Sequence, residues 1–481
     1  MRRAAVGAHE NLRRPALAGV NRKSGVLLAI AMVLWWLRPP DGLTLEAWRL
    51  FVIVATAIGA VVANALPLLT ASVLAVAAAV LGRVLTPEQA YAGFANGTIL
   101  LIVLAFLVAR SVITSGLGVR IGHWMVGRFG RSAIGLSYSI FFVDALIAPA
   151  FPSSTARSGV IYPMALSLAN AAGATAEAAD RRRLGTFLMF SGIASISLSS
   201  ALWLTAMAGN PLGAELARHA GVEIAFGSWL MASSVPTLTA MLLMPLLLRR
   251  CTAPEVHETP DAPAQARRAL AALGPLTYSE KVVLVAFGGM VALWAVAATL
   301  SIDSTAVAFL GLALLLLSGV LTPAHLAKEG GVLATFIWFA VLFALCGNLN
   351  ELGFIAYLGN ALSAAMGGWS APAAYVALVF AYVVLHYMFV SQTAHLLALF
   401  GVFLAVGVNT GLPAALLAYQ LLFANNYFSG LTPQASSANV LFATSGLISQ
   451  RDLYVLGAIV TAFNMAVFLI VGTPWLWLLT R

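Results

Sequence analysis

The stretches Pro152-Ser153-Ser154-Thr155-Ala156-Arg157 and Val390-Ser391-Gln392-Thr393-Ala394-His395 carry the same small polar pattern at two distant places in the chain. Each stretch interrupts an otherwise apolar region. Irregular polar backbone survives at membrane depth only where protein surrounds it or where it lines a watery cavity. Because the pattern occurs twice, we expect two half-sites that face each other in one transport site.

The composition of the 481-residue chain is that of an integral membrane protein. Hydrophobic residues make up 61% of it and charged residues 9%, which is more apolar sequence than the interior of a soluble domain can hold. Apolar runs that can cross the hydrocarbon core recur along the whole chain. We therefore expect a multi-pass protein that meets the lipid bilayer and a solute, and no nucleic acid.

The formal net charge of +9 is distributed so that it reports orientation in the membrane. Six Lys and Arg residues fall in the first 23 positions, whereas none lies between Lys328 and Arg451. Cytoplasmic loops are enriched in Lys and Arg, and a cytoplasmic N-terminus places nearly every basic cluster on that side. We therefore expect the N-terminus in the cytoplasm.

An internal repeat organises the chain. Val84-Leu85-Thr86-Pro87 recurs as Val320-Leu321-Thr322-Pro323, and Leu117-Gly118 recurs as Leu352-Gly353. The separation within each of these pairs is nearly the same as the separation of the two S-x-T-A stretches. Three matches in the same order at a nearly constant offset indicate a duplication.

The repeat predicts the fold class, an all-α polytopic membrane protein with about 11 spans and two re-entrant hairpins. Each repeat would hold five spans and one hairpin, and an odd number of spans makes the two copies inverted in the membrane. The expected boundaries are 1–47 for the cytoplasmic N-terminus and an extra first helix, 48–250 for the first repeat with its hairpin at 134–168, 251–279 for a cytoplasmic linker, and 280–481 for the second repeat with its hairpin at 373–408.

The two hairpin tips have the residue types of an anion site. Ser and Thr are preferred helix N-caps, so each S-x-T-A stretch predicts the start of the second half-helix of its hairpin. Free N–H groups and a partial positive charge at such a helix start suit a carboxylate. Hydroxyl groups at both tips and the amide of Gln392 add further hydrogen-bond donors.

Arg157 and His395 lie in the first turns of these half-helices, where the helix dipole disfavours a cation. Something negative should therefore offset them, and a bound anion is one candidate. For Arg157 the alternative is a structural ion pair with Asp144 in the other limb of the hairpin. For His395 it is a hydrogen-bonded packing residue, although its register with Arg157 under the repeat favours a role in the site.

The next span of each repeat contains a polar break, at 205–211 and at 432–439. Small residues, amides and prolines favour unwound backbone that lines a cavity, and the alternative is an ordinary span end that turns into a loop. We expect structural pairs or helix-end positions for most other polar outliers, namely Asp144, His386, Arg110 and Asn348. The candidate substrate-binding residues are Ser153, Ser154, Thr155, Arg157, Asn210, Ser391, Gln392, Thr393, His395, Thr432 and Pro433.

Nothing in the sequence indicates a cofactor, a metal site or an enzyme. Cys251 and Cys346 are the two cysteines, and they form neither a CxxC motif nor a metal-like spacing with histidine. The chain also has no HExxH, GxSxG or P-loop motif. We therefore expect a transporter without cofactors that has no catalytic residues.

These residues together resemble the divalent anion/sodium symporter family, from about Trp48 to the C-terminus. The chain is most similar to the branch of bacterial citrate/succinate antiporters and plastid 2-oxoglutarate/malate translocators. The strings that carry the resemblance are Pro152 to Gly159 (PSSTARSG), Leu204 to Pro211 (LTAMAGNP) and His386 to His395 (HYMFVSQTAH).

The resemblance implies a homodimer of scaffold and transport domains, an elevator-type mechanism, and a di- or tricarboxylate held between the tips. In sodium-coupled relatives the tips also bind sodium, and here Arg157 and His395 would supply that positive charge. A fixed cation disfavours movement of the empty carrier, so sodium-independent exchange of dicarboxylates such as 2-oxoglutarate, malate or succinate follows as a hypothesis.

The alternatives are a sodium-coupled di- or tricarboxylate symporter and, with Asp144 as its titratable group, a sodium/proton antiporter. Ser154 replaces the usual tip asparagine of the family, and Pro433-Gln434 stands where the translocator branch has His-Tyr. The substrate can therefore differ from malate.

Overall fold

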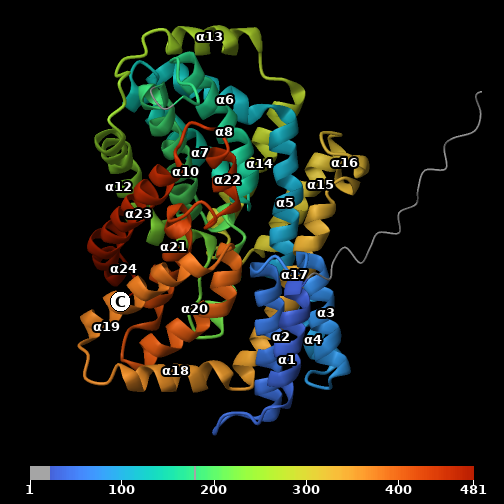
Figure 1. Ribbon diagram of the computed structural model, residues 1–481. Helices are drawn as coiled ribbons and strands as arrows, with labels where there is room; N and C mark the ends of the chain where they lie inside the picture. The colour runs from blue at the N-terminus through green and yellow to red at the C-terminus, as the bar shows by residue number, and fades with distance from the viewer. Residues whose placement is uncertain (1–21, 178–179, 481) are drawn as a thin grey trace, which may run out of the picture.

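The computed structural model describes residues 22–177 and 180–480, and every regular element in them is a helix (Figure 1). The expected cytoplasmic N-terminus falls on residues 1–21, outside the described residues. Ten helices of the described chain are long and apolar enough to cross a membrane, and three further apolar helices are shorter. The protein is therefore a multi-pass, all-α integral membrane protein, as the composition predicts.

The first part of the chain builds a bundle of spans and one short helix. Thr44 caps the second span, and Thr86 forms a capping box with Gln89 at the short helix that begins at Pro87, a residue whose fixed φ suits a first helical turn. The helices are α1 (Arg22–Trp36), α2 (Leu45–Val62), α3 (Leu68–Leu81), α4 (Pro87–Tyr91) and α5 (Gly97–Ser115).

The corresponding part of the second repeat follows the linker. Thr322 caps its short helix, which begins at Pro323, so the repeated Val-Leu-Thr-Pro strings form the same structure twice. The helices are α13 (Ala262–Ala272) in the linker, α14 (Tyr278–Val296), α15 (Ser304–Leu317), α16 (Pro323–Ala327) and α17 (Gly330–Glu351).

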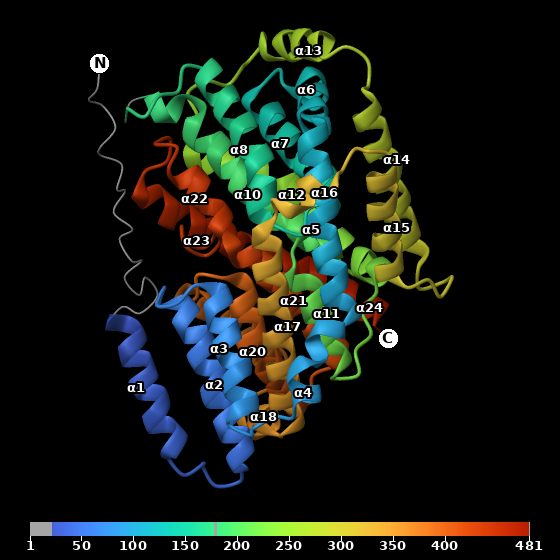
Figure 2. The same cartoon turned by 90° about the vertical axis from the view of Figure 1, so that its right-hand side faces the viewer.

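A glycine bends the chain at the end of the third span of each repeat, after α5 and after α17. Gly116 and Gly353 adopt the left-handed conformation, with φ of 80° and 82°, which glycine reaches without the Cβ penalty of other residues. The chain continues into the arm helices, α6 (Leu117–Phe129) and α18 (Phe354–Ala365). The two arms lie at opposite ends of the molecule, α6 under α13 and α18 at the far end (Figures 1 and 2), which is the arrangement of inverted repeats.

Each arm leads into a helical hairpin and then into a broken span. The hairpins are α7 (Ala133–Ile147) with α8 (Ser154–Ala171), and α19 (Ala371–Leu385) with α20 (Gln392–Asn409). The broken spans are α10 (Thr186–Leu202) with α11 (Gly209–Arg218), and α21 (Ala414–Tyr427) with α22 (Ser437–Ala443). The last spans are α12 (Phe226–Thr252) and α23 (Gln450–Val467), the latter continued by α24 (Thr473–Leu479).

Over the described residues this order contains the two helical hairpins and the two broken spans expected from the sequence. The broken spans form the core, because every residue of α10 is buried and so are nearly all of α21. The hairpins, the broken spans and the last spans gather on one side, and α1–α5 with α14–α17 gather on the other (Figure 1). The tips thus lie against the most buried helices of the protein.

The bends at Gly116 and Gly353 can be tested by substitution. Changing either residue to alanine forces a Cβ into the left-handed conformation, although space is free around both positions. Each variant should lose about 1–2 kcal/mol of stability. Gly288→Ala is the matched control, because Gly288 lies within α14 with equally free space and should be neutral or slightly stabilising. Thermal unfolding of the detergent-purified protein measures the differences, and equal melting temperatures of all variants would contradict the assignment.

Candidate functional site

Both hairpin tips end in a capped helix, as predicted. The hydroxyl of Ser153 accepts a hydrogen bond from Ala156 N at 3.2 Å, and the hydroxyl of Ser391 accepts one from Ala394 N at 3.3 Å. The half-helices that follow are α8 and α20. Two helix N-termini with their partial positive charge are therefore present within the fold, one from each repeat.

The first tip is tied to the first break by two hydrogen bonds. Thr205 Oγ1 donates to the carbonyl of Pro149, and Ala208 N donates to the carbonyl of Pro152, both at 2.9 Å. In the second repeat, His386 Nε2 bonds to the carbonyl of Ala435 at 2.9 Å. Because hydrogen bonds join the hairpin to the break in this way, the hairpin and the broken span form one unit in each repeat.

Two asparagines hold the breaks open with the same pair of hydrogen bonds. Asn210 Nδ2 donates to the carbonyls of Ser200 and Trp203 at 2.8 and 3.1 Å. Asn439 Nδ2 donates to the carbonyls of Ser429 and Thr432 at 2.7 and 3.0 Å. The acceptors lie at the same two spacings before the asparagine in both cases. These amides satisfy carbonyls that the helix break leaves without a partner.

Side chains also connect the two repeats to each other. Asn426 Nδ2 donates to Asn210 Oδ1 at 2.8 Å, and the hydroxyls of Ser197 and Ser429 are in contact. At the tips, Thr155 Oγ1 contacts the hydroxyl of Ser437, which begins α22. Polar contacts between the two repeats therefore run between the breaks and from the first tip to α22.

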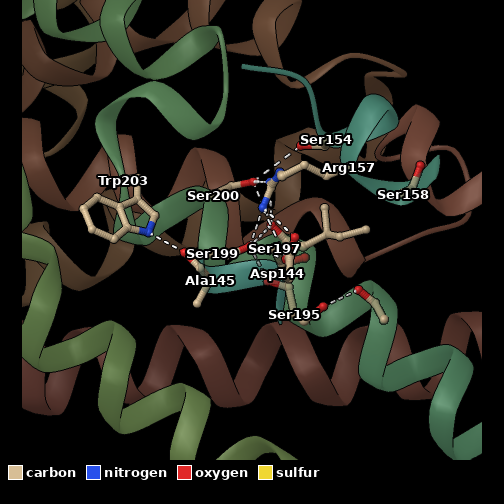
Figure 3. Close-up of polar contacts among 12 residues, drawn as sticks. Asp144, Ala145, Ser154, Arg157, Ser158, Ser195, Ser197, Ser199, Ser200 and Trp203 are labelled. Atoms are coloured by element: carbon tan, nitrogen blue, oxygen red, sulfur yellow. Dashed lines mark hydrogen bonds and ion pairs between the residues drawn. The ribbon is translucent and has the colours of Figure 1, made fainter. Parts of the chain in front are cut away.

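Arg157 lies in the centre of a buried network in the first repeat (Figure 3). Its Nη1 lies 3.2 Å from Asp144 Oδ1 and 3.3 Å from Asp144 Oδ2, and both side chains are 0% exposed. Nη2 donates to the carbonyl of Ile196 at 3.1 Å. The guanidinium also contacts the hydroxyls of Ser199 and Ser200, and Ser199 contacts Asp144 as well.

This network corrects one part of the expectation from the sequence. The anion that offsets Arg157 is Asp144, which is the alternative considered above, so the charge of Arg157 does not depend on a bound substrate. Oxygen atoms of a carboxylate, two hydroxyls and a carbonyl surround the guanidinium. Arg157 therefore lies in a buried pocket lined by oxygen atoms.

His395 lies in a different environment at the matching position of the second repeat. Its ring centroid lies 4.3 Å from that of Tyr382, 4.9 Å from that of Phe428 and 5.0 Å from that of Phe389. The ring of His386 is 5.1 Å away. His395 is 0% exposed, and neither of its ring nitrogens has a hydrogen-bond partner of good geometry.

The other candidate residues divide into accessible and structural positions. Thr155 is exposed, whereas Ser153, Ser154, Ser391, Thr393 and Pro433 are partly buried or buried, and Gln392 is buried, donating to the carbonyl of Asn425 at 2.7 Å. Asn210 uses its amide entirely within the protein, so it shapes the break and has no free donor. Thr432 is buried, and its hydroxyl has no partner.

Sequence reasoning missed the residues that surround the two basic side chains. Ser199, Ser200, Tyr382 and Phe428 come from other helices, and serine or an aromatic ring in an apolar span is ordinary packing by type. One signal was present, because the offset that pairs Arg157 with His395 also pairs Asp144 with Tyr382. The remaining polar outliers form structural contacts as expected, Arg110 with Glu329 at 3.2 Å and Asn348 with the carbonyl of Ala344 at 2.8 Å.

Paired re-entrant hairpins, two broken spans and inverted repeats define the class of secondary transporters whose site lies between the repeats. The family model described as "Sodium:sulfate symporter transmembrane region" matches residues 21–480. The chain thus belongs to the divalent anion/sodium symporter family, as the tips and breaks suggested.

Similar proteins come from bacteria and from plants. YflS of Bacillus subtilis (strain 168), named as a candidate malate transporter, is 38% identical over 94% of this chain and 95% of its own length. Dicarboxylate transporter 2, chloroplastic, of Spinacia oleracea is 36% identical over 91% of this chain and 78% of its own. Inner membrane protein YbhI of Escherichia coli (strain K12) is 30% identical over 94% of this chain and 96% of its own length.

A solved structure shares the fold at low sequence identity. The YdaH transporter of Alcanivorax borkumensis aligns with a TM-score of 0.56 at 16% identity and covers 95% of this chain and 97% of that one. At this identity the likeness concerns the fold alone.

The buried ion pair can be tested by a double-mutant cycle. Asp144→Asn or Arg157→Met alone should destabilise the protein by about 3–5 kcal/mol, because each change leaves the other residue as a buried ion without a counter-charge. The double variant Asp144→Asn/Arg157→Met should lose clearly less than the sum of the single changes. Arg218→Gln serves as the control, because its pair with Glu215 is half-exposed and contributes less than about 1 kcal/mol. Thermal unfolding in detergent measures all four variants, and additive losses would contradict a coupled pair.

Proposed function

We propose that the protein exchanges dicarboxylates across a bacterial inner membrane without sodium. The observation that carries the proposal is the pair of capped helix N-termini, one per repeat, joined by the contacts of the two breaks. Each N-terminus offers N–H groups and a partial positive charge, which suits one carboxylate. A substrate with two carboxylates would have one for each tip, and 2-oxoglutarate, malate and succinate fit this description.

The relatives support the substrate class. The spinach protein is named a chloroplastic dicarboxylate transporter and the Bacillus protein a candidate malate transporter, and each aligns over more than nine-tenths of this chain. The inner-membrane location of the Escherichia coli relative supports the same location here. The basic residues at the ends of α6 and α12 and in the middle of α13 support a cytoplasmic face at that end of the molecule.

Arg157 supports sodium independence. Its guanidinium already occupies the oxygen-rich pocket beside the first tip, so a sodium ion would have to displace a covalently tethered cation there. In the second repeat, aromatic rings surround His395 instead of an oxygen set. His395 would supply the second positive charge when its ring is protonated. Arg157 and His395 thus take the place of bound cations in the two repeats.

Exchange follows from the state of the empty tips. Since Asp144 neutralises Arg157, the penalty on an empty carrier does not come from that charge. It would come from the N–H groups at the two helix starts, which would cross the membrane without a bound anion to accept from them. A bound dicarboxylate removes this penalty, so movement requires a substrate in each direction.

Movement itself would be of the elevator type in a homodimer. The hairpins and broken spans would move as one body against α1–α5 and α14–α17, and the arms α6 and α18 would join the two parts. The two repeats, 48–250 and 280–481, would each contribute to both parts, and the linker 251–279 would connect them. Candidate ligands at the tips are Ser153, Ser154, Thr155, Ser391, Gln392 and Thr393, with Asn210, Thr432 and Pro433 shaping the breaks.

Proteoliposomes test the proposal directly. Uptake of labelled succinate or 2-oxoglutarate should require unlabelled dicarboxylate inside and should be the same when potassium replaces sodium. Uptake into empty liposomes that is driven by a sodium gradient would instead establish the alternative, a sodium-coupled symporter. A panel of unlabelled dicarboxylates inside the liposomes then ranks the substrates.

Substitutions at the tips test where the anion binds. Thr155→Val removes an exposed hydroxyl and Ser391→Ala removes a cap, so each should weaken exchange about tenfold or more, since a lost hydrogen bond to a charged group is worth about 1.5–3 kcal/mol. Ser363→Ala is the control, because Ser363 is on the arm α18 and bonds only to the carbonyl of Asn360. Exchange in all three variants at the wild-type rate would contradict the site.

A further inference from the structure

The surroundings of His386 and His395 set them apart from every other titratable pair in the described chain. The two rings are 5.1 Å apart and edge to face, and both are 0% exposed. His386 stacks on Phe428 with ring centroids 3.8 Å apart, and Tyr382 and Phe389 complete an aromatic box around His395. An aromatic ring stabilises a cation at such distances when its face is turned to the charge.

The first repeat carries a permanent charge, that of Arg157, at the position that corresponds to His395. One common offset along the chain pairs Asp144 with Tyr382 and Arg157 with His395. The two asparagines that hold the breaks set a slightly different offset for the broken spans, and it pairs Ser199 with Phe428. A carboxylate and a serine that hold a guanidinium are thus replaced by a phenol and a phenyl ring around an imidazole. The second repeat has exchanged a fixed ion pair for a group that can gain or lose a proton.

No carboxylate balances a charge on this pair. Among the described residues, no Asp or Glu comes within ion-pair distance of either imidazole. The helices α18, α19 and α21, which pack on α20, contain no Asp, Glu, Lys or Arg. Glu215 and Arg218 of α11 pair with each other, and Glu351 at the end of α17 is exposed.

The tyrosines of α19 and α21 other than Tyr382 are directed to other partners. The hydroxyls of Tyr375 and Tyr419 bond to Thr473 and Ser228, and the ring of Tyr427 packs on Phe468. Tyr382 is the tyrosine that faces His395, and its hydroxyl has no partner. The charge of the imidazole pair therefore depends on protons alone and on whatever anion binds nearby.

The hydrogen bonds of His386 define where a proton can go. A carbonyl only accepts, so the bond to Ala435 places the hydrogen of His386 on Nε2. This leaves Nδ1 of His386 without a hydrogen-bond partner. The ring nitrogens of His395 form no hydrogen bond of good geometry, although the side chain of Asn425 and the backbone of Tyr382 lie close to them. Two imidazolium ions this close repel each other, so the pair has room for one added proton.

We propose that His386 and His395 form a proton-binding site, and that each dicarboxylate is carried together with one proton. The inference rests on the proposed function and deepens it. An isolated charge is costly to bury, so the pair stays neutral when the tips are empty. When the dianion binds at the tip of α20, it supplies the missing negative charge, and one imidazole nitrogen takes a proton from water. On release, the N–H bond breaks and the proton returns to water on the other side of the membrane.

The direction of the pH dependence follows from this linkage. Substrate binding takes up a proton, so the affinity for the dianion falls as the pH rises, by at most about tenfold per pH unit for one proton. His395 lies in the first turn after the tip and is the carrier of the charge. His386 is a positioning residue that shares the proton and orients the box through its bond to Ala435.

Titration calorimetry on the purified full-length protein counts the proton. Binding of 2-oxoglutarate, whose carboxylates stay ionised between about pH 6 and pH 8.5, is measured in phosphate and in Tris, two buffers with different ionisation enthalpies. We expect uptake of about one proton per dicarboxylate and an affinity that falls as the pH rises. In His395→Gln and His386→Gln, the proton uptake should disappear and the affinity should become independent of pH.

Two control variants and two further outcomes make the experiment decisive. Tyr382→Phe keeps the box without the hydroxyl, and His257→Gln changes an exposed histidine of the linker, so both should retain proton uptake. If one histidine variant does not fold, the other still reports the proton count. Wild-type binding without proton uptake and with the same affinity at every pH would overturn the inference and leave the exchanger intact. No binding of dicarboxylate at any pH would overturn the proposed function, and this inference with it.

Discussion

The structure depends on the need of every backbone amide and carbonyl at membrane depth to find a partner within the protein. Broken helices violate this need, and two asparagines restore it. Asn210 and Asn439 each donate to two carbonyls at the same spacing, and Asn210 also accepts from Asn426 of the other repeat. The hairpin tips, the breaks and the core helices α10 and α21 are held in place by these bonds. The proposed anion site at the tips would depend on these bonds, because they satisfy backbone carbonyls of the breaks.

The inverted repeats are alike in backbone and unlike in charge. Both tips are capped by serine and both breaks are held by asparagine. The first repeat then buries a complete ion pair, whereas the second buries two imidazoles among aromatic rings. A neutral pair is costly to break but changes nothing when a ligand arrives. A titratable pair responds to the ligand, so the chemistry that varies during transport would be confined to the second repeat.

Local patterns in the sequence predicted much of this arrangement. Ser153 and Ser391 cap helices because serine accepts from the third residue of a first turn, and the Thr-Pro strings start α4 and α16 for the same local reason. The breaks at 205–211 and 432–439 were predicted from clusters of small residues, amides and prolines. The partner of Arg157 could not be predicted from the sequence. Asp144 and a bound anion would both balance its charge, and the sequence does not say which of them lies closer.

The sequence by itself determined the membrane class, the duplication, the hairpins with their capped tips, and the register of Arg157 with His395. These properties follow from composition, periodicity and contacts within one helical turn. Only the tertiary structure decided that Asp144 neutralises Arg157, that the amide of Asn210 bonds to the backbone of the break, and that aromatic rings enclose His395. The physical reason is that the environment of a buried charge is made by side chains from helices far apart in the chain, such as Ser199 and Phe428. Their role is not visible in their residue types.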